Sequence, residues 1–140
     1  MSVDAIIKGV VDIQKTIPGI ISSFSDAPTS INQLPCFVNY PAEGELLWPR
    51  LNSQRVIYHD INMDLYVQKG GDLQAADRIL KPYIDLVVDT FDQNITLGGS
   101  AFNSGVVKYQ YGKVEYAGVE YLGIKFILKV EERKQVLYKA

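Results

Sequence analysis

The first 24 residues place apolar side chains at helical spacing, with the charged residues largely off the apolar stripe. This pattern is typical of an amphipathic helix. Its apolar members are Val3, Ile6, Ile7, Val10, Val11, Ile13, Ile17, Ile20, Ile21 and Phe24. Ser2 is a suitable N-cap, and Pro18 should end the helix near residue 17. We predict a helix over residues 2–17, packed on the protein's own sheet or on a neighbouring molecule, and then a linker over residues 22–35.

The clearest strand pattern covers residues 55–69, where apolar and polar side chains alternate strictly. One face of this strand is almost wholly apolar, so we expect a sheet that is covered on one side only. A shorter strand is predicted at residues 36–40. Residues 41–54, which contain two prolines and Trp48, predict an extended arm because they are too many for a tight hairpin. Trp48 either contacts a partner or caps the protein's own core. Deletion of residues 42–53 should leave a folded protein with impaired assembly.

A second helical stripe predicts a helix over residues 72–92 that is capped by Asp72. Pro82 interrupts the stripe, so we expect either a kink in this helix or two short helices joined at Pro82. Residues 94–105 are rich in glycine and read as a flexible loop. A β-hairpin follows over residues 106–131, with Ala117-Gly118 as its turn. A two-residue turn would set Glu115 opposite Glu120, which is unfavourable and leaves the register open. Residues 131–134 either continue the strand or are solvated.

This order of elements, in 140 residues, predicts one domain spanning residues 1–140. The fold class is α+β, with a mostly antiparallel sheet, helices packed on one face and a C-terminal β-hairpin.

Net charge and hydropathy limit the classes of partner that we expect. The formal net charge is −2, from 14 Lys and Arg against 16 Asp and Glu, and no basic stripe is present. Nucleic-acid-binding domains usually carry such a stripe, so specific binding to nucleic acid is not expected. The charged residues near the N-terminus interrupt any apolar stretch of signal-peptide or membrane length, so we expect a soluble protein without a membrane partner.

The candidate chemical groups do not form a recognisable site. Cys36 is the only cysteine and reads as a buried, unreactive thiol, and His59 falls on the apolar face of its strand. Residues 60–64 resemble the start of a calcium loop, but Leu65 and Gly71 stand where glycine and glutamate are needed. Residues 98–100 follow a helix rather than a strand, unlike a phosphate loop. We therefore predict no catalytic, cofactor or metal site and no enzyme, with a small α+β ligand-binding protein or enzyme as the alternative.

Several landmarks along the chain together resemble the small tail-completion proteins of long-tailed bacteriophages, in particular the tail terminators. The likeness spans about residues 34–130. It is carried by four segments: Leu34-Pro35-Cys36-Phe37-Val38, Asp64-Leu65-Tyr66-Val67, Lys81-Pro82-Tyr83-Ile84-Asp85 with Phe91, and Tyr116-Ala117-Gly118-Val119-Glu120-Tyr121-Leu122-Gly123-Ile124-Lys125-Phe126.

The resemblance implies a structural virion protein that is located in the host cytoplasm before it is assembled into the tail. Its subunits would form a ring, expected to be a hexamer, on the head-proximal end of the tail tube. The ring would end tube polymerisation, contact the tail tube protein and the head-tail connector protein, and let DNA pass without specific binding. A head-tail connector or neck adaptor is the alternative within the same class.

The arm, the glycine-rich loop and the exposed hairpin edges are the predicted contact elements, because free strand edges accept strands from neighbours. The candidate interface residues are Glu43, Glu45, Leu47, Trp48, Arg50, Phe102, Asn103, Tyr109 and Tyr111.

Overall fold

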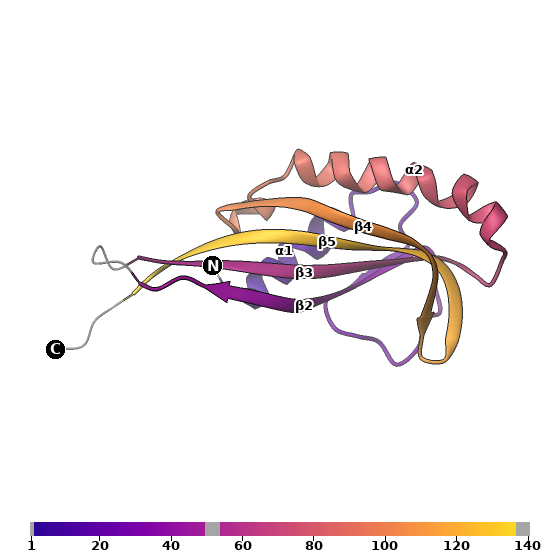
Figure 1. Cartoon of the computed structure of the whole chain (residues 1–140), viewed down its shortest axis with the longest axis horizontal. Coiled ribbons are helices and arrows are strands. Elements are labelled where there is room, and N and C mark those ends of the chain that lie inside the picture. The colour runs from indigo at the N-terminus through magenta and orange to yellow at the C-terminus, as the bar shows by residue number, and fades with distance from the viewer. Residues whose placement is uncertain (1, 50–53, 137–140) are drawn as a thin grey trace.

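The computed structural model describes residues 2–49 and 54–136 (Figure 1). Two helices, one short 3-10 turn and five strands follow one another in these described residues. Their bounds are α1 Val3–Gln14, β1 Ser22–Phe24, β2 Cys36–Leu46, β3 Gln54–Lys69, α2 Leu73–Asp92, η1 Leu97–Gly99, β4 Asn103–Tyr116 and β5 Val119–Gln135.

The five strands form one sheet in the order β1-β2-β3-β5-β4. Only β1 and β2 run parallel, over the pairs from Ser22–Cys36 to Phe24–Val38, and the other three pairings are antiparallel. This confirms the predicted α+β class and the mostly antiparallel sheet. It also confirms the C-terminal hairpin.

Both helices pack on the same face of the sheet, which we call the helix face. In the register, Met63 of β3 faces Phe126 of β5, and Ile61 faces Leu128. These side chains join Ile6 and Val10 of α1, and Leu80 and Phe91 of α2, in one buried cluster. The predicted helix therefore packs on the protein's own sheet, and the sheet is covered on one side over most of its length. We call the other side the open face.

Helix caps follow the sequence. The Ser2 hydroxyl accepts a hydrogen bond from the Ala5 N–H at 3.1 Å, and the Asp72 carboxylate accepts one from the Ala75 N–H at 2.8 Å. Each satisfies a backbone donor that the first turn of a helix leaves without a partner. Pro82 lies inside α2, which continues as one helix to Asp92 instead of dividing in two.

The turn of the β4–β5 hairpin has the predicted two residues, Ala117 and Gly118, both at positive φ. The register does set Glu115 opposite Glu120. The Lys113 ammonium lies 3.2 Å from the Glu120 carboxylate and offsets the repulsion between the two glutamates. The structure thus gives the register that the sequence left open.

The structure corrects three boundaries and decides between the two alternatives left open at residues 131–134. Residues 41–46, predicted as part of an arm, continue β2 beyond a bulge between Pro41 and Glu43, so deletion of residues 42–53 would remove half a strand. Residues 22–24, predicted as linker, add β1 to the sheet edge. Residues 131–135 continue β5 and pair with β3, and the glycine-rich loop contains η1 and the first residues of β4.

That loop packs against α1 and is not a free connector. Leu97 and Ala101 are buried in the main core. A Cβ placed on Gly9 of α1 would lie 2.6 Å from the Leu97 carbonyl oxygen. Glycine at this helical position allows the loop backbone to approach the helix.

Candidate assembly surface

The sheet ends in two free edges on opposite sides. At one side, β4 pairs with β5 alone, so its other edge has no strand beside it among the described residues. At the other side, β1 covers β2 only from Cys36 to Val38. The outer edge of β2 is therefore open from Asn39 to Leu46 in the described part of the chain. We call these two surfaces the β4 edge and the β2 edge.

Exposed apolar side chains gather at these two edges. The large apolar residues most open to solvent include three at the β2 edge or just after it and four at the β4 edge or just before it. They are Tyr40, Leu46 and Trp48 on one side, and Phe102, Val107, Tyr109 and Tyr111 on the other. Trp48 is 90% exposed. Clusters of exposed apolar and aromatic side chains are typical of surfaces that contact other proteins.

The predicted interface residues divide between the two edges. Glu43, Glu45, Leu47 and Trp48 lie along or just after β2, while the other described ones lie at β4, across the full width of the sheet. Arg50 lies outside the described residues. The predicted set is therefore not one patch but two surfaces that face away from each other.

Some β4-edge residues already have partners inside the chain. The Arg133 guanidinium lies over the Phe102 ring, 3.5 Å from its centre, and also contacts the Glu131 carboxylate at 2.8 Å. Tyr109 and Tyr111 are stacked on each other, with ring centres 6.5 Å apart. A hydrogen bond to Asp77 of α2 raises the pKa of the Tyr111 phenol.

Sequence reasoning missed Tyr40, Leu46 and Val107 as exposed edge residues. The apolar pair at 106–107 was a usable signal, because two neighbouring apolar residues cannot both face the core in a regular strand. In the structure, a register shift between Val106 and Lys108 leaves Val107 61% exposed.

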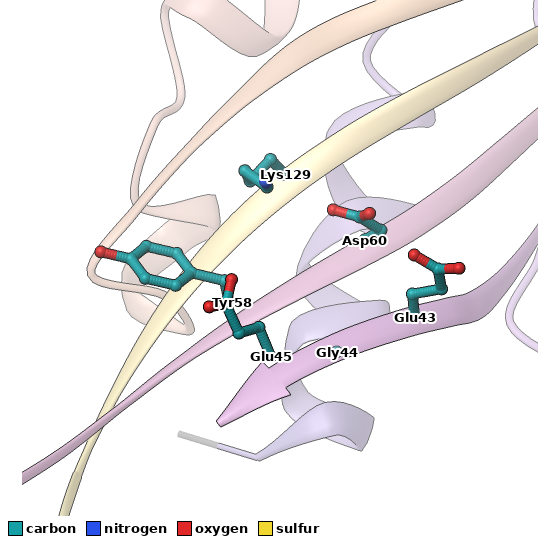
Figure 2. Close-up of a pocket in the computed structure, with 6 residues that line it drawn as sticks. All are labelled: Glu43, Gly44, Glu45, Tyr58, Asp60 and Lys129. Carbon is teal, nitrogen blue, oxygen red and sulfur yellow. The ribbon is translucent and has the colours of Figure 1, made fainter. Parts of the chain in front are cut away.

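The open face carries opposite charges at its two sides. Glu43, Glu45 and Asp60 lie on β2 and β3, and they line a shallow hollow together with Tyr58 and Lys129 (Figure 2). Figure 2 shows these side chains on the side of the sheet away from α1. Lys108 on β4 and Lys125 on β5 stand on the other half of the same face, as the register requires. The β2 side is therefore acidic and the β4 side basic.

Cys36 and His59, the two candidate chemical groups in the sequence, are both buried. Burial raises the pKa of the Cys36 thiol to about 11, so the thiolate that a nucleophile needs is scarce at neutral pH. His59 lies on the helix face, where its Nε2 is 2.8 Å from the Glu132 carboxylate, which is itself buried. The two groups lie on opposite faces of the sheet and do not meet.

A third buried group is Asp64, which is only 4% exposed. The Tyr40 hydroxyl donates a hydrogen bond to its Oδ2 at 3.0 Å, whereas Oδ1 has no partner among the described residues. Burial raises the pKa of Asp64, against the opposing effects of the Tyr40 hydrogen bond and the Lys125 charge. Sequence reasoning missed this group because strand alternation placed it on the polar face.

Among the described residues, no three His, Cys, Asp or Glu side chains lie close enough together to hold a metal ion. None of the helices in that part of the chain is long and apolar enough to cross a membrane. No family model and no curated protein matches this chain.

Proposed function

We propose that this protein is a structural virion subunit that forms a ring on the head-proximal end of a bacteriophage tail tube. The ring ends tube polymerisation and joins the tail to the head. Its partners are further copies of itself, the tail tube protein and the head-tail connector protein. The proposal gives the protein no catalytic step and no cofactor.

The observation that supports it best is the placement of exposed apolar side chains at two opposite, unlike edges of one sheet. A single contact patch favours a twofold dimer, whereas two different patches that face away from each other favour head-to-tail association. Head-to-tail contacts close into a ring when the rotation between copies divides a full turn. The resemblance of residues 34–130 to tail terminators supports the same class of assembly.

The modest negative charge fits a ring through which DNA slides. A net charge of −2 gives no general attraction for phosphate, and like charges repel. A ring whose inner wall proved strongly basic would contradict this part of the proposal.

The test is the mass and shape of the purified protein with and without isolated tail tubes, measured by light scattering and negative-stain microscopy. Rings in solution, or caps on one end of each tube, are the expected result. A protein that stays monomeric and leaves tubes uncapped and still growing would overturn the proposal.

A further inference from the structure

We propose that the β4 edge of one copy pairs with the open half of the β2 edge of the next copy, so that the sheet continues from subunit to subunit. This inference rests on the proposed ring, and it names the two surfaces that hold the ring together. The occupant of each free edge is a second copy of this chain.

Backbone groups are available on both edges. The two-residue turn makes Tyr116 and Val119 a hydrogen-bonded pair, and such pairs alternate along antiparallel strands. The N–H and C=O groups of Tyr109, Tyr111 and Lys113 therefore point away from β5. Unpaired strand edges of this kind are templates for another strand.

The β2 edge follows the same rule. The Leu47 N–H donates to the Val56 carbonyl at 3.0 Å, so the alternation turns the backbone groups of Gly44 and Leu46 outward. Pro41 has no N–H to offer, and prolines within sheets are confined to edge strands and bulges. The available stretch of the β2 edge therefore lies after the bulge.

Charge selects β2 as the partner of β4. The β4 stretch from Asn103 to Val114 contains two lysines and no acidic residue, and the β2 stretch from Asn39 to Leu46 contains two glutamates and no basic residue. Lys108, Glu43 and Glu45 all project from the open face. Pairing of β4 with β4 would instead set two lysine-bearing stretches side by side, with no acidic residue to oppose them.

The helix face carries further side chains beside the two edges. A hollow of about 470 Å³ lies beside Pro41, between the first turns of α1 and the residues that follow β1. Its wall combines the apolar Val3 and Ile7 with polar and charged side chains, namely Asp4, Lys8, Ser25 and Asp26. Tyr109 and Tyr111 project from the helix face of β4. In a continuous sheet with all helices on one side, these phenol rings and the hollow of the neighbouring copy lie on the same face of the sheet.

Charge reversal tests the pairing. The β2-edge variant is Glu43→Lys with Glu45→Lys, and the β4-edge variant is Lys108→Glu. Self-association of each is measured by sedimentation velocity and light scattering, on proteins whose circular dichroism matches that of the wild type. If the wild type assembles only on tail tubes, the same comparison is made by counting capped tube ends. Asp85→Lys with Asp89→Lys, on exposed positions of α2, is the control with the same change in net charge as the β2-edge variant.

Each edge variant alone should need about tenfold more protein to assemble, because like charges then face each other across the interface. An equimolar mixture of the two should assemble like the wild type, since every contact in an alternating ring again joins opposite charges. The protein carrying all three substitutions should also recover, and the α2 control should be unaffected.

Three results would overturn the inference. The first is edge variants that assemble normally, and the second is a mixture that fails to recover. The third is a wild type that forms no oligomer at about 1 mM and none on tail tubes. A twofold dimer lost only in the β4-edge variant would assign the edge to β4–β4 pairing instead. The proposed function fails separately. Rings that obey the charge rule but ignore tubes keep the inference and remove the tail role, while capped tubes with no charge dependence do the reverse.

Discussion

At the scale of single residues, burial on the open face decides the chemistry of the ionisable groups. Cys36 and Tyr66 lie in a small buried cluster beneath the bent tip of the β4–β5 hairpin. The Tyr116 hydroxyl donates to the Pro28 carbonyl and links the hairpin to the loop that covers the cluster. Burial raises the pKa of both Cys36 and Tyr66, so both groups are neutral at physiological pH.

The thiol of Cys36 should be inert in the native protein. At pH 8 the folded protein should react with a thiol reagent only through unfolding, because the side chain is inaccessible and its pKa is about 11. Labelling should become complete within minutes in denaturant. Labelling kinetics followed by mass spectrometry check this, and rapid modification under native conditions would contradict it.

Asp64 should make stability fall as the pH rises. Its pKa is raised in the folded state, so the native protein holds this proton more tightly than the unfolded chain does. That contribution is complete below the unfolded pKa, which is about 3.9, and is lost as the pH rises through the folded value. Asp64→Asn should therefore match the wild type in acid and be more stable at pH 7.

The measurement is denaturant unfolding of both proteins across this pH range. Tyr40→Phe removes the hydrogen bond that favours the ionised form, so its stability should fall more steeply with pH than that of the wild type. An Asp64→Asn variant that is less stable than the wild type at pH 7 would refute the assignment.

At the scale of elements, a buried amide pair holds α1 to the sheet. Gln14 and Asn39 donate hydrogen bonds to each other's side-chain oxygens, both at 2.7 Å, and Asn39 also donates to the Phe24 carbonyl at 3.0 Å. The Ser23 hydroxyl donates to Gln14 as well. These contacts bring α1, β1 and β2 together at one point, and sequence periodicity did not reveal it.

Substitutions of Gln14 and Asn39 should have non-additive effects on the free energy of unfolding. Asn39→Leu should lower the free energy of unfolding by about 2 kcal/mol, because the buried Gln14 amide loses its partner. Gln14→Met should cost a similar amount. The double variant should cost clearly less than the sum, since most of each penalty comes from the group left unpaired. Additive effects in urea unfolding would show that the two amides act independently.

At the scale of the whole molecule, exposed residues at the two edges should affect assembly without affecting the stability of the fold. Trp48 is almost fully exposed, so Trp48→Ala should change the free energy of unfolding by less than about 0.5 kcal/mol. Tryptophan side chains often contribute most of the binding energy at protein contacts. The fraction of protein that forms oligomeric rings or tube caps should therefore drop by about tenfold or more.

The matched control is Ile21→Ala, which removes an exposed apolar side chain just before β1, outside the predicted contact elements. Both variants are compared with the wild type by thermal unfolding and by counting rings or capped tubes. A Trp48→Ala protein that is destabilised but still assembles would place the indole in the fold and not at a contact.

Local patterns gave correct elements where one face of the element meets the core. The alternation from Ile57 to Val67 and the stripe of α1 record which side is buried, so both were readable without coordinates. Patterns failed at residues 41–46, which are exposed along their whole length. A strand with no buried face carries no alternation, so its hydrogen bonds to β3 were invisible in the sequence.

The fold class, both helix caps and the hairpin turn could be predicted from the amino-acid sequence, because they depend on residues a few positions apart. The folded structure was needed to show which strands lie side by side, that Asp64 is buried, and that the exposed apolar residues divide between two opposite edges. Those properties join residues that lie far apart in the chain, such as Gln14 with Asn39 and Tyr40 with Asp64. Local periodicity contains no information about which distant strand becomes a neighbour.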